Sequence, residues 1–194
     1  SISYGSNAIE LTIEGFFKTT SNINRYFMND SLSGLFHSVG ESKSYGIDIL
    51  LKRKFRTHEL LLAYSLGKVE ERFEQNSSQE FSQAPQDQRH EIKINFLFRF
   101  NKLKVSLNQV CGSGFNNRVD GLYFKGREPY SRFDLGMEYD LVSRKFDVDL
   151  GISVLNLFNV QNVRLNQFSS FPDGSITYVS GVPFTPSLNL VARF

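Results

Sequence analysis

Hydrophobic and polar residues alternate with a period of two along almost the whole chain. The clearest run covers residues 91–100, in which every second residue is Ile or Phe and most residues between them are polar or charged. Successive side chains of a strand point to opposite sides, so this period is typical of a strand with one apolar and one polar face. A helical period is hard to find anywhere. The pattern therefore predicts an all-β protein.

Eight runs of this kind predict eight strands. A tilted strand needs about 9–11 residues to cross the hydrocarbon layer of a membrane, whereas a strand of a globular protein has about 5–6. Most of these runs are of the longer kind, and residues 2–4 are predicted to be the tail of a ninth strand. The eight runs cover residues 8–18, 45–55, 59–67, 91–100, 103–108, 132–141, 146–154 and 188–194.

Short and long connections alternate along the chain. In an up-and-down sheet this puts all short turns at one end and all long loops at the other, as in outer-membrane barrels. The sequence therefore favours a transmembrane antiparallel up-and-down β-barrel. The strands of a soluble barrel or sandwich also alternate between apolar and polar residues, with the apolar face inward. The pattern does not exclude this alternative. The tight links fall at residues 5–7, 56–57, 101–102 and 143–144, and the long ones at about 28–36, 74–87, 115–129 and 164–186.

Composition narrows the possibilities further. The 194 residues include 22 lysines and arginines against 20 aspartates and glutamates, a formal net charge of +2. This balance argues against nucleic acid as a partner. No apolar stretch approaches the roughly 18 residues of a transmembrane helix. A transmembrane barrel remains possible, because its apolar residues alternate with polar ones and average out.

Signatures of catalysis and metal binding are absent from the sequence. His37, His58 and His90 are too scattered for a zinc motif, and residues 112–114 lack the strand–turn–helix pattern of a nucleophile elbow. Asp147 and Asp149 share a strand face, but two carboxylates make a poor cation site without more oxygen ligands. We therefore expect no enzyme activity, no catalytic residue, no metal and no cofactor.

Four segments carry a resemblance to a known family. They are residues 39–48 (VGESKSYGID) and 84–90 (APQDQRH) at the starts of two strands, residues 154–159 (VLNLFN), and residues 183–186 (PFTP) leading to Arg193-Phe194. In this order they resemble the C-terminal part of a TonB-dependent outer-membrane receptor of the Bacteroidetes type. No single segment is specific, but together they span essentially the whole chain.

The resemblance implies a place in a larger assembly. The family has a barrel of about 22 strands with a plugged lumen, so residues 1–194 would be the C-terminal portion of the barrel, without the plug domain and the N-terminal strands. The implied site of action is the cell outer membrane. The implied function is import of a scarce nutrient: a metal chelate, a vitamin, a glycan or a peptide.

The implied partners are outer-membrane lipid, the rest of the barrel with its plug, and the TonB system acting through that plug. A surface lipoprotein as a further partner stays open, and the ligand is not identified. Phe194 would be the signal read by the barrel-assembly machinery. Two alternatives also remain: a stand-alone eight-stranded outer-membrane barrel with an adhesive, structural or enzymatic role, and a soluble lipid-binding barrel.

Two sets of residues are candidates for function in this reading. Recognition usually lies on loops held by a rigid scaffold, although self-packing or membrane anchoring is the commoner explanation for any one loop aromatic. The predicted capture residues are Phe115, Arg118, Tyr123, Phe124, Arg127, Phe168, Phe171 and Tyr178. The predicted lumen-facing residues are Glu10, Glu14, Asp48, Lys52, Lys93, Arg99, Glu138, Asp147 and Asp149.

Overall fold

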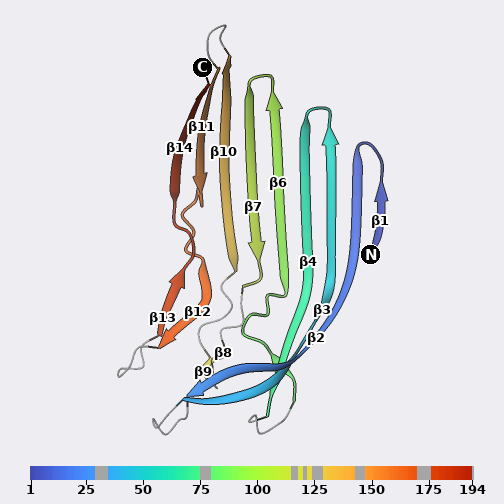
Figure 1. Ribbon diagram of the computed structural model, residues 1–194, viewed down its shortest axis with the longest axis vertical. Helices are drawn as coiled ribbons and strands as arrows, with labels where there is room; N and C mark the ends of the chain where they lie inside the picture. Colours follow the sequence, from blue (N-terminus) through green and yellow to red (C-terminus); the bar gives the residue numbers. More distant parts are fainter. Residues whose placement is uncertain are drawn as a thin grey trace.

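A single antiparallel sheet dominates the computed structural model (Figure 1). The structure describes residues 1–28, 35–74, 80–114, 118–119, 122–123, 129–142, 147–169 and 176–193. Each strand of the sheet pairs with the next along the chain, which confirms the predicted all-β, up-and-down architecture. The order is β1 (Ile2–Gly5), β2 (Ile9–Met28), β3 (Leu35–Phe55), β4 (His58–Phe73), β6 (His90–Phe100), β7 (Leu103–Gly112), β10 (Tyr130–Val142), β11 (Asp147–Leu155) and β14 (Thr185–Arg193).

Shorter strands lie within the long connections, which the sequence pattern treated as loops. β5 (Ser82–Gln83) pairs with β4, while β8 (Arg118–Val119) pairs with β9 (Leu122–Tyr123) and β12 (Val163–Ser169) pairs with β13 (Ile176–Ser180). All of them lie at the lower end of Figure 1, opposite the tight turns. The structure therefore confirms the predicted division into a turn end and a loop end.

Strand register gathers the polar side chains on one face of the sheet. Glu14 lies opposite Asp48, Asp48 opposite Ser65, and Ser65 opposite Glu91, so one polar row crosses four strands. The same parity places eight of the nine predicted lumen-facing residues on this polar face. For Asp147 the structure describes only the backbone, which pairs with Arg193. That this face lines a lumen stays a prediction.

The opposite, apolar face is uncovered. Among the described residues only Phe73 and Ala84 are buried apolar side chains, whereas Leu188 is 73% exposed and Phe17 is 71% exposed. A strand buries one face by packing it against another layer, and the described sheet has no second layer on this side. Soluble monomers rarely expose an apolar patch of this extent. The described part of the chain therefore leaves this apolar face uncovered.

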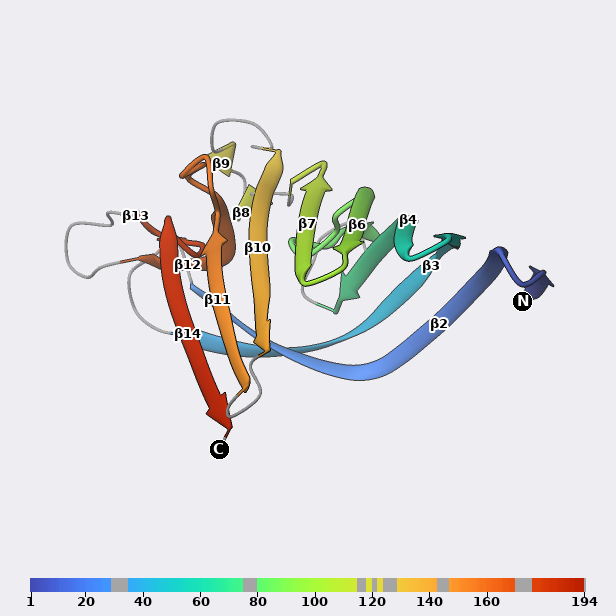
Figure 2. The same ribbon diagram turned by 90° about the horizontal axis from the view of Figure 1, so that it is seen from above.

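The sheet is curved but does not close, and β1 and β14 form its two edges (Figure 2). Two shallow hollows of about 410 and 270 Å³ lie on the polar face, one over Gly136 and Gly151 and the other beside Phe16. The polar face is the concave side of the curved sheet, where shallow hollows are expected. In the described part of the chain, no helix is long and apolar enough to cross a membrane.

Candidate functional site at the loop end

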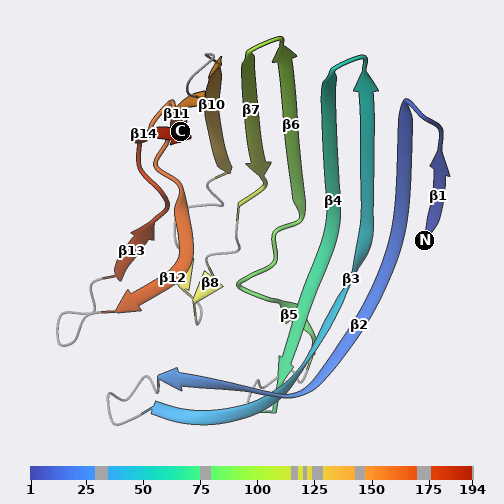
Figure 3. The ribbon, with the colours of Figure 1, turned by 45° about the horizontal axis from the view of Figure 1, so that its top comes forward.

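The β2–β3 hairpin bends where one extra residue interrupts its pairing. The register shifts between Ser21 and Ile23, and Asn22 between them has a φ of 58°. A bulge of this kind bends the strand and increases its twist. Pairing of β3 with β4 ends at Gly40 and Phe73, so the hairpin continues past the bend without β4 beside it. Figure 3 shows this part curving away from the sheet.

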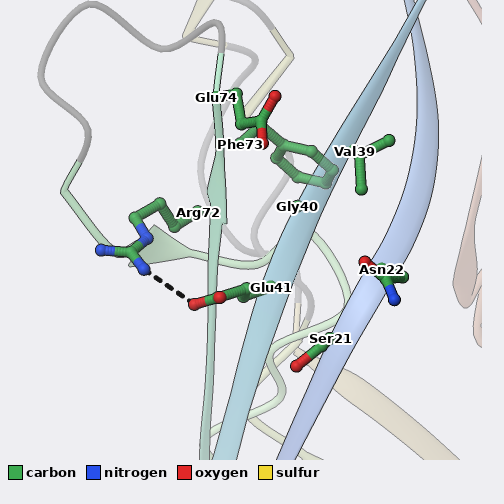
Figure 4. Close-up of a pocket in the computed structure, with 8 residues that line it drawn as sticks. All are labelled: Ser21, Asn22, Val39, Gly40, Glu41, Arg72, Phe73 and Glu74. Carbon is green, nitrogen blue, oxygen red and sulfur yellow. Dashed lines mark hydrogen bonds and ion pairs between the residues drawn. The ribbon is translucent and has the colours of Figure 1, made fainter.

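A hollow of about 310 Å³ lies at the bend (Figure 4). Gly40 is needed there, because a Cβ at this position would lie 2.4 Å from the Arg72 carbonyl oxygen and 2.5 Å from the Phe73 ring. The Arg72 guanidinium forms an exposed ion pair with Glu41, 2.8 Å from Nη2 to Oε2. The lining residues are Ser21, Asn22, Val39, Gly40, Glu41, Arg72, Phe73 and Glu74.

An ion pair between half-buried Arg25 and buried Glu71 joins the base of the bent hairpin to β4. The Glu71 side chain is 6% exposed, and its Oε2 lies 2.6 Å from Arg25 Nη2. This oxygen accepts no hydrogen bond from the described residues, so the ion pair is its polar contact. The other oxygen, Oε1, accepts a 2.5 Å hydrogen bond from Gln86 Nε2. The Arg25 guanidinium also lies 4.9 Å from the centre of the Phe73 ring.

A second buried carboxylate holds the segment before β6 against β4. Asp87 has no exposed surface, and its Oδ1 accepts a 2.6 Å hydrogen bond from the Val69 backbone N–H. Its Oδ2 accepts from Gln83 Nε2. The Ala84 N–H donates to the Val69 carbonyl over 2.9 Å. Residues 84–90, one of the four resemblance segments, therefore act as an anchor for the β4–β6 connection.

A buried asparagine, Asn156, anchors the connection that follows β11. The Asn156 side-chain amide donates 2.9 Å hydrogen bonds to the carbonyls of Val160 and Val182, and its oxygen accepts from Val160 N–H. Its own N–H donates to Asp134 Oδ1 over 2.8 Å. Asn156 has a φ of 51°, which Asn adopts more readily than most residues. Residues 154–159 thus form a turn that ties β10 and β11 to the segment before β14.

Two of the four resemblance segments, residues 84–90 and 154–159, therefore anchor long connections at the loop end of the sheet. The sequence analysis identified the segments, but it did not predict that Asp87 and Asn156 would be fully buried. It missed the Arg25–Glu71 pair altogether. Those two residues are far apart in the chain, and only the pairing of β2, β3 and β4 brings them together, so no local pattern could have revealed them.

The predicted capture residues are only partly within the described structure. Phe115, Phe124, Arg127 and Phe171 lie outside the described residues, as does Phe194. For the other four, the structure describes the backbone alone. Their role in capture stays a prediction. These four residues are Arg118 in β8, Tyr123 in β9, Phe168 in β12 and Tyr178 in β13.

Several predicted lumen-facing charges form ion pairs across the polar face. Arg99 pairs with Glu59 and Glu138 with Lys104, each over 2.8 Å. Asp149 lies 2.7 Å from Arg193, so this carboxylate already has a cationic partner. In the described part of the chain, no group of three or more His, Cys, Asp or Glu residues could hold a metal ion. The polar face is thus a surface of mixed charge.

The protein was compared with family models, with curated proteins and with solved structures. None of the three comparisons gave a match. Its function must therefore follow from the two faces of the sheet, the asymmetric connections and the anchored loop end.

Proposed function

We propose that this chain forms the C-terminal wall of a TonB-dependent transporter in the outer membrane. Its apolar face would contact lipid, its polar face would line the passage, and its long connections would help to capture a scarce nutrient. The observation that carries this proposal is the single-layered sheet, which leaves one apolar face uncovered and gathers charge on the other. Membrane barrels have this arrangement, because only closed strand pairing satisfies the backbone within lipid.

The apolar face has the length that a membrane-spanning strand requires. The run of apolar positions spans nine residues in β2 (9–17) and in β6 (92–100), and eleven in β3 (45–55), where Arg53 interrupts it. About 9–11 residues are needed for a tilted strand to cross the hydrocarbon layer. Three strands therefore support an apolar band of similar length.

Aromatic and charged side chains border this band at both ends. At the loop end, the Tyr45 hydroxyl donates to Glu70, and Lys68 lies 2.5 Å from the same carboxylate. At the turn end, the Arg53 guanidinium lies 4.4 Å from the centre of the Phe55 ring. Aromatic girdles with adjacent charge are typical of the two membrane–water interfaces. They support placement of the band across the bilayer.

The open edges of the sheet support a wall rather than a small closed barrel. β1 and β14 each have only one neighbouring strand in the described structure, and Leu190 on β14 is 65% exposed. An unpaired edge exposes backbone donors and acceptors, which cannot be left unsatisfied within lipid. In the proposed assembly, strands of the remaining barrel pair with both edges. The plug of that assembly couples transport to TonB.

Intact mass and co-purification from detergent-solubilised outer membranes test the proposal. We expect the chain to travel with a polypeptide that contains a plug and the remaining strands. A folded species that runs alone at about the 22.2 kDa of this chain would overturn the proposal in favour of a stand-alone barrel. Solubility without detergent would overturn it in favour of a soluble lipid-binding barrel.

Uptake of radiolabelled nutrient by the intact receptor tests the capture role. We expect deletion of residues 115–129 and 164–180, which leaves β14 and Val182 in place, to abolish saturable uptake, because loops on a rigid scaffold carry recognition. The matched control is Lys102→Ala in the tight turn at residues 101–102, which lies at the other end of the sheet. Unchanged uptake after the loop deletions would contradict a role in capture.

A further inference from the structure

The bent part of the β2–β3 hairpin forms an arm, defined here as residues 23–28 and 35–39. Its strands stay paired from Ile23 and Gly40 out to Met28 and Leu35. Figure 2 shows the arm crossing the open side of the curved sheet, and Figure 3 shows that it does so at the loop end. The arm therefore spans the mouth of the concave polar face.

The base of the arm determines where the arm lies. A two-stranded ribbon is marginally stable by itself in water, and within the described structure the arm has no third strand beside it. Its side-chain contact is Arg25, which reaches Glu71 of β4 and the ring of Phe73. Close to the bend, the Glu74 N–H also donates a 3.4 Å hydrogen bond to the Val39 carbonyl. Gln86 binds the same carboxylate from the β4–β6 connection. One buried group thus joins the arm, the sheet and a neighbouring loop.

The docked arm leaves two buried oxygens without a hydrogen-bond donor or acceptor from the described protein. They are Glu71 Oε2, which has only the ion pair, and the hydroxyl of Ser38, which is 3% exposed. Ser38 lies opposite Arg25 in the arm's own pairing. Buried polar atoms are normally hydrogen-bonded, so both oxygens would gain water if the arm moved away. This gain offsets part of the cost of separating the ion pair.

We propose that the arm is a latched lid over the loop-end mouth of the polar face, and that Arg25, Glu71 and Gln86 form the latch. The inference rests on the proposed function, in which that face lines the passage. The bulge at Asn22 is the hinge, because it already interrupts the pairing that would stiffen the hairpin. The lid has two positions: docked with Arg25 on Glu71, or lifted with both charges hydrated.

Distances between spin labels test the latch directly. Nitroxides are attached to Asn24→Cys on the arm and Ser187→Cys on β14, in the complete receptor carrying Cys111→Ser. The variants are Arg25→Glu, Glu71→Arg and the two combined. The matched control reverses the neighbouring exposed pair with Arg72→Glu and Glu41→Arg. That pair has the same chemistry but lies outside the latch.

We expect one short, narrow distance distribution in the unaltered latch. Arg25→Glu and Glu71→Arg should each shift most of the label-to-label distances to longer values with a broader spread. The double variant should restore the short distance. The control reversals should leave it unchanged. Distributions that stay short in both single reversals, or that lengthen equally in the control, would overturn the latch.

The charge reversals alter a buried site and could prevent folding. Two variants that introduce no new charge are therefore measured as well. Glu71→Gln and Gln86→Ala should each raise the long-distance fraction, and an unchanged distribution in both would also overturn the latch. Heat-modifiable migration establishes that each variant is folded. The distance measurement requires neither transport nor TonB. It can therefore disprove the latch without disproving the proposed function, and the uptake measurement can disprove the capture role without disproving the latch.

Discussion

The apolar band and the loop end of this sheet are stabilised in different ways. In the band, neighbouring strands present Ile, Leu, Val and Phe on one side, and the ion pairs on the other side are mostly exposed. At the loop end, Glu71, Asp87 and Asn156 are buried and bound by partners from separate segments. A repeated local pattern therefore specifies the band, whereas a few long-range polar contacts specify the loop end.

This difference predicts how each region tolerates substitution. Changes in the band should depend on the face that a residue occupies, because the environment is uniform on each side. Changes at the loop end should depend on the number of polar groups left without partners, because those groups are buried.

The largest effect is expected for Asn156→Ala. It removes both donors to the Val160 and Val182 carbonyls and the acceptor for Val160 N–H. Each unsatisfied buried group costs about 1–3 kcal/mol, so we expect the free energy of unfolding to fall by about 3–5 kcal/mol. Urea unfolding of the intact barrel in lipid vesicles measures it. Asn159→Ala, in the same turn, is the control, and an equal loss in both would contradict the anchor role of Asn156.

A smaller loss of stability is expected when arginine replaces a leucine in β3, and its size should depend on the face that the leucine occupies. Leu51 belongs to the apolar face and Leu50 to the polar face. Arginine on the lipid face near the bilayer midplane costs about 2–4 kcal/mol, so Leu51→Arg should lower the free energy of unfolding by about that amount. Leu50→Arg should cost far less, because it faces the polar side. Equal losses in the same vesicle assay would show that the apolar face does not contact lipid.

Much of the fold could be predicted from the sequence because a period of two is a local property. The eight runs and the tail at residues 2–4 became nine of the ten strands of the main sheet, in the predicted order. The positions of Glu14 and Asp48 on one face follow from the same parity. The turn at Arg56 was also visible, as a short polar break between two runs, and Arg56 has a φ of 53°.

The loop end could not be predicted in the same way. Beyond residue 18 the alternation of β2 weakens, so the length of the hairpin, its bulge at Asn22 and its bend left no clear pattern. Arg25 and Glu71 look like ordinary exposed charges until β3 pairs with both of their strands. Asn156 and Asp87 lay in segments that the family resemblance singled out, but burial depends on packing against residues far away in the chain. Pairwise contacts of this kind have no periodic signal.

The smallest effect is expected where the polar face carries an exposed ion pair. Lys93 lies 2.5 Å from Glu91, and their side chains are 57% and 31% exposed. Exposed pairs contribute little because water screens both charges. Lys93→Gln should therefore change the free energy of unfolding by less than about 0.5 kcal/mol in the same vesicle assay. Arg25→Gln is the matched comparison, because it removes one charge from a pair whose carboxylate is buried and should cost several times more. If the two variants lost the same stability, burial would not distinguish the loop end from the wall.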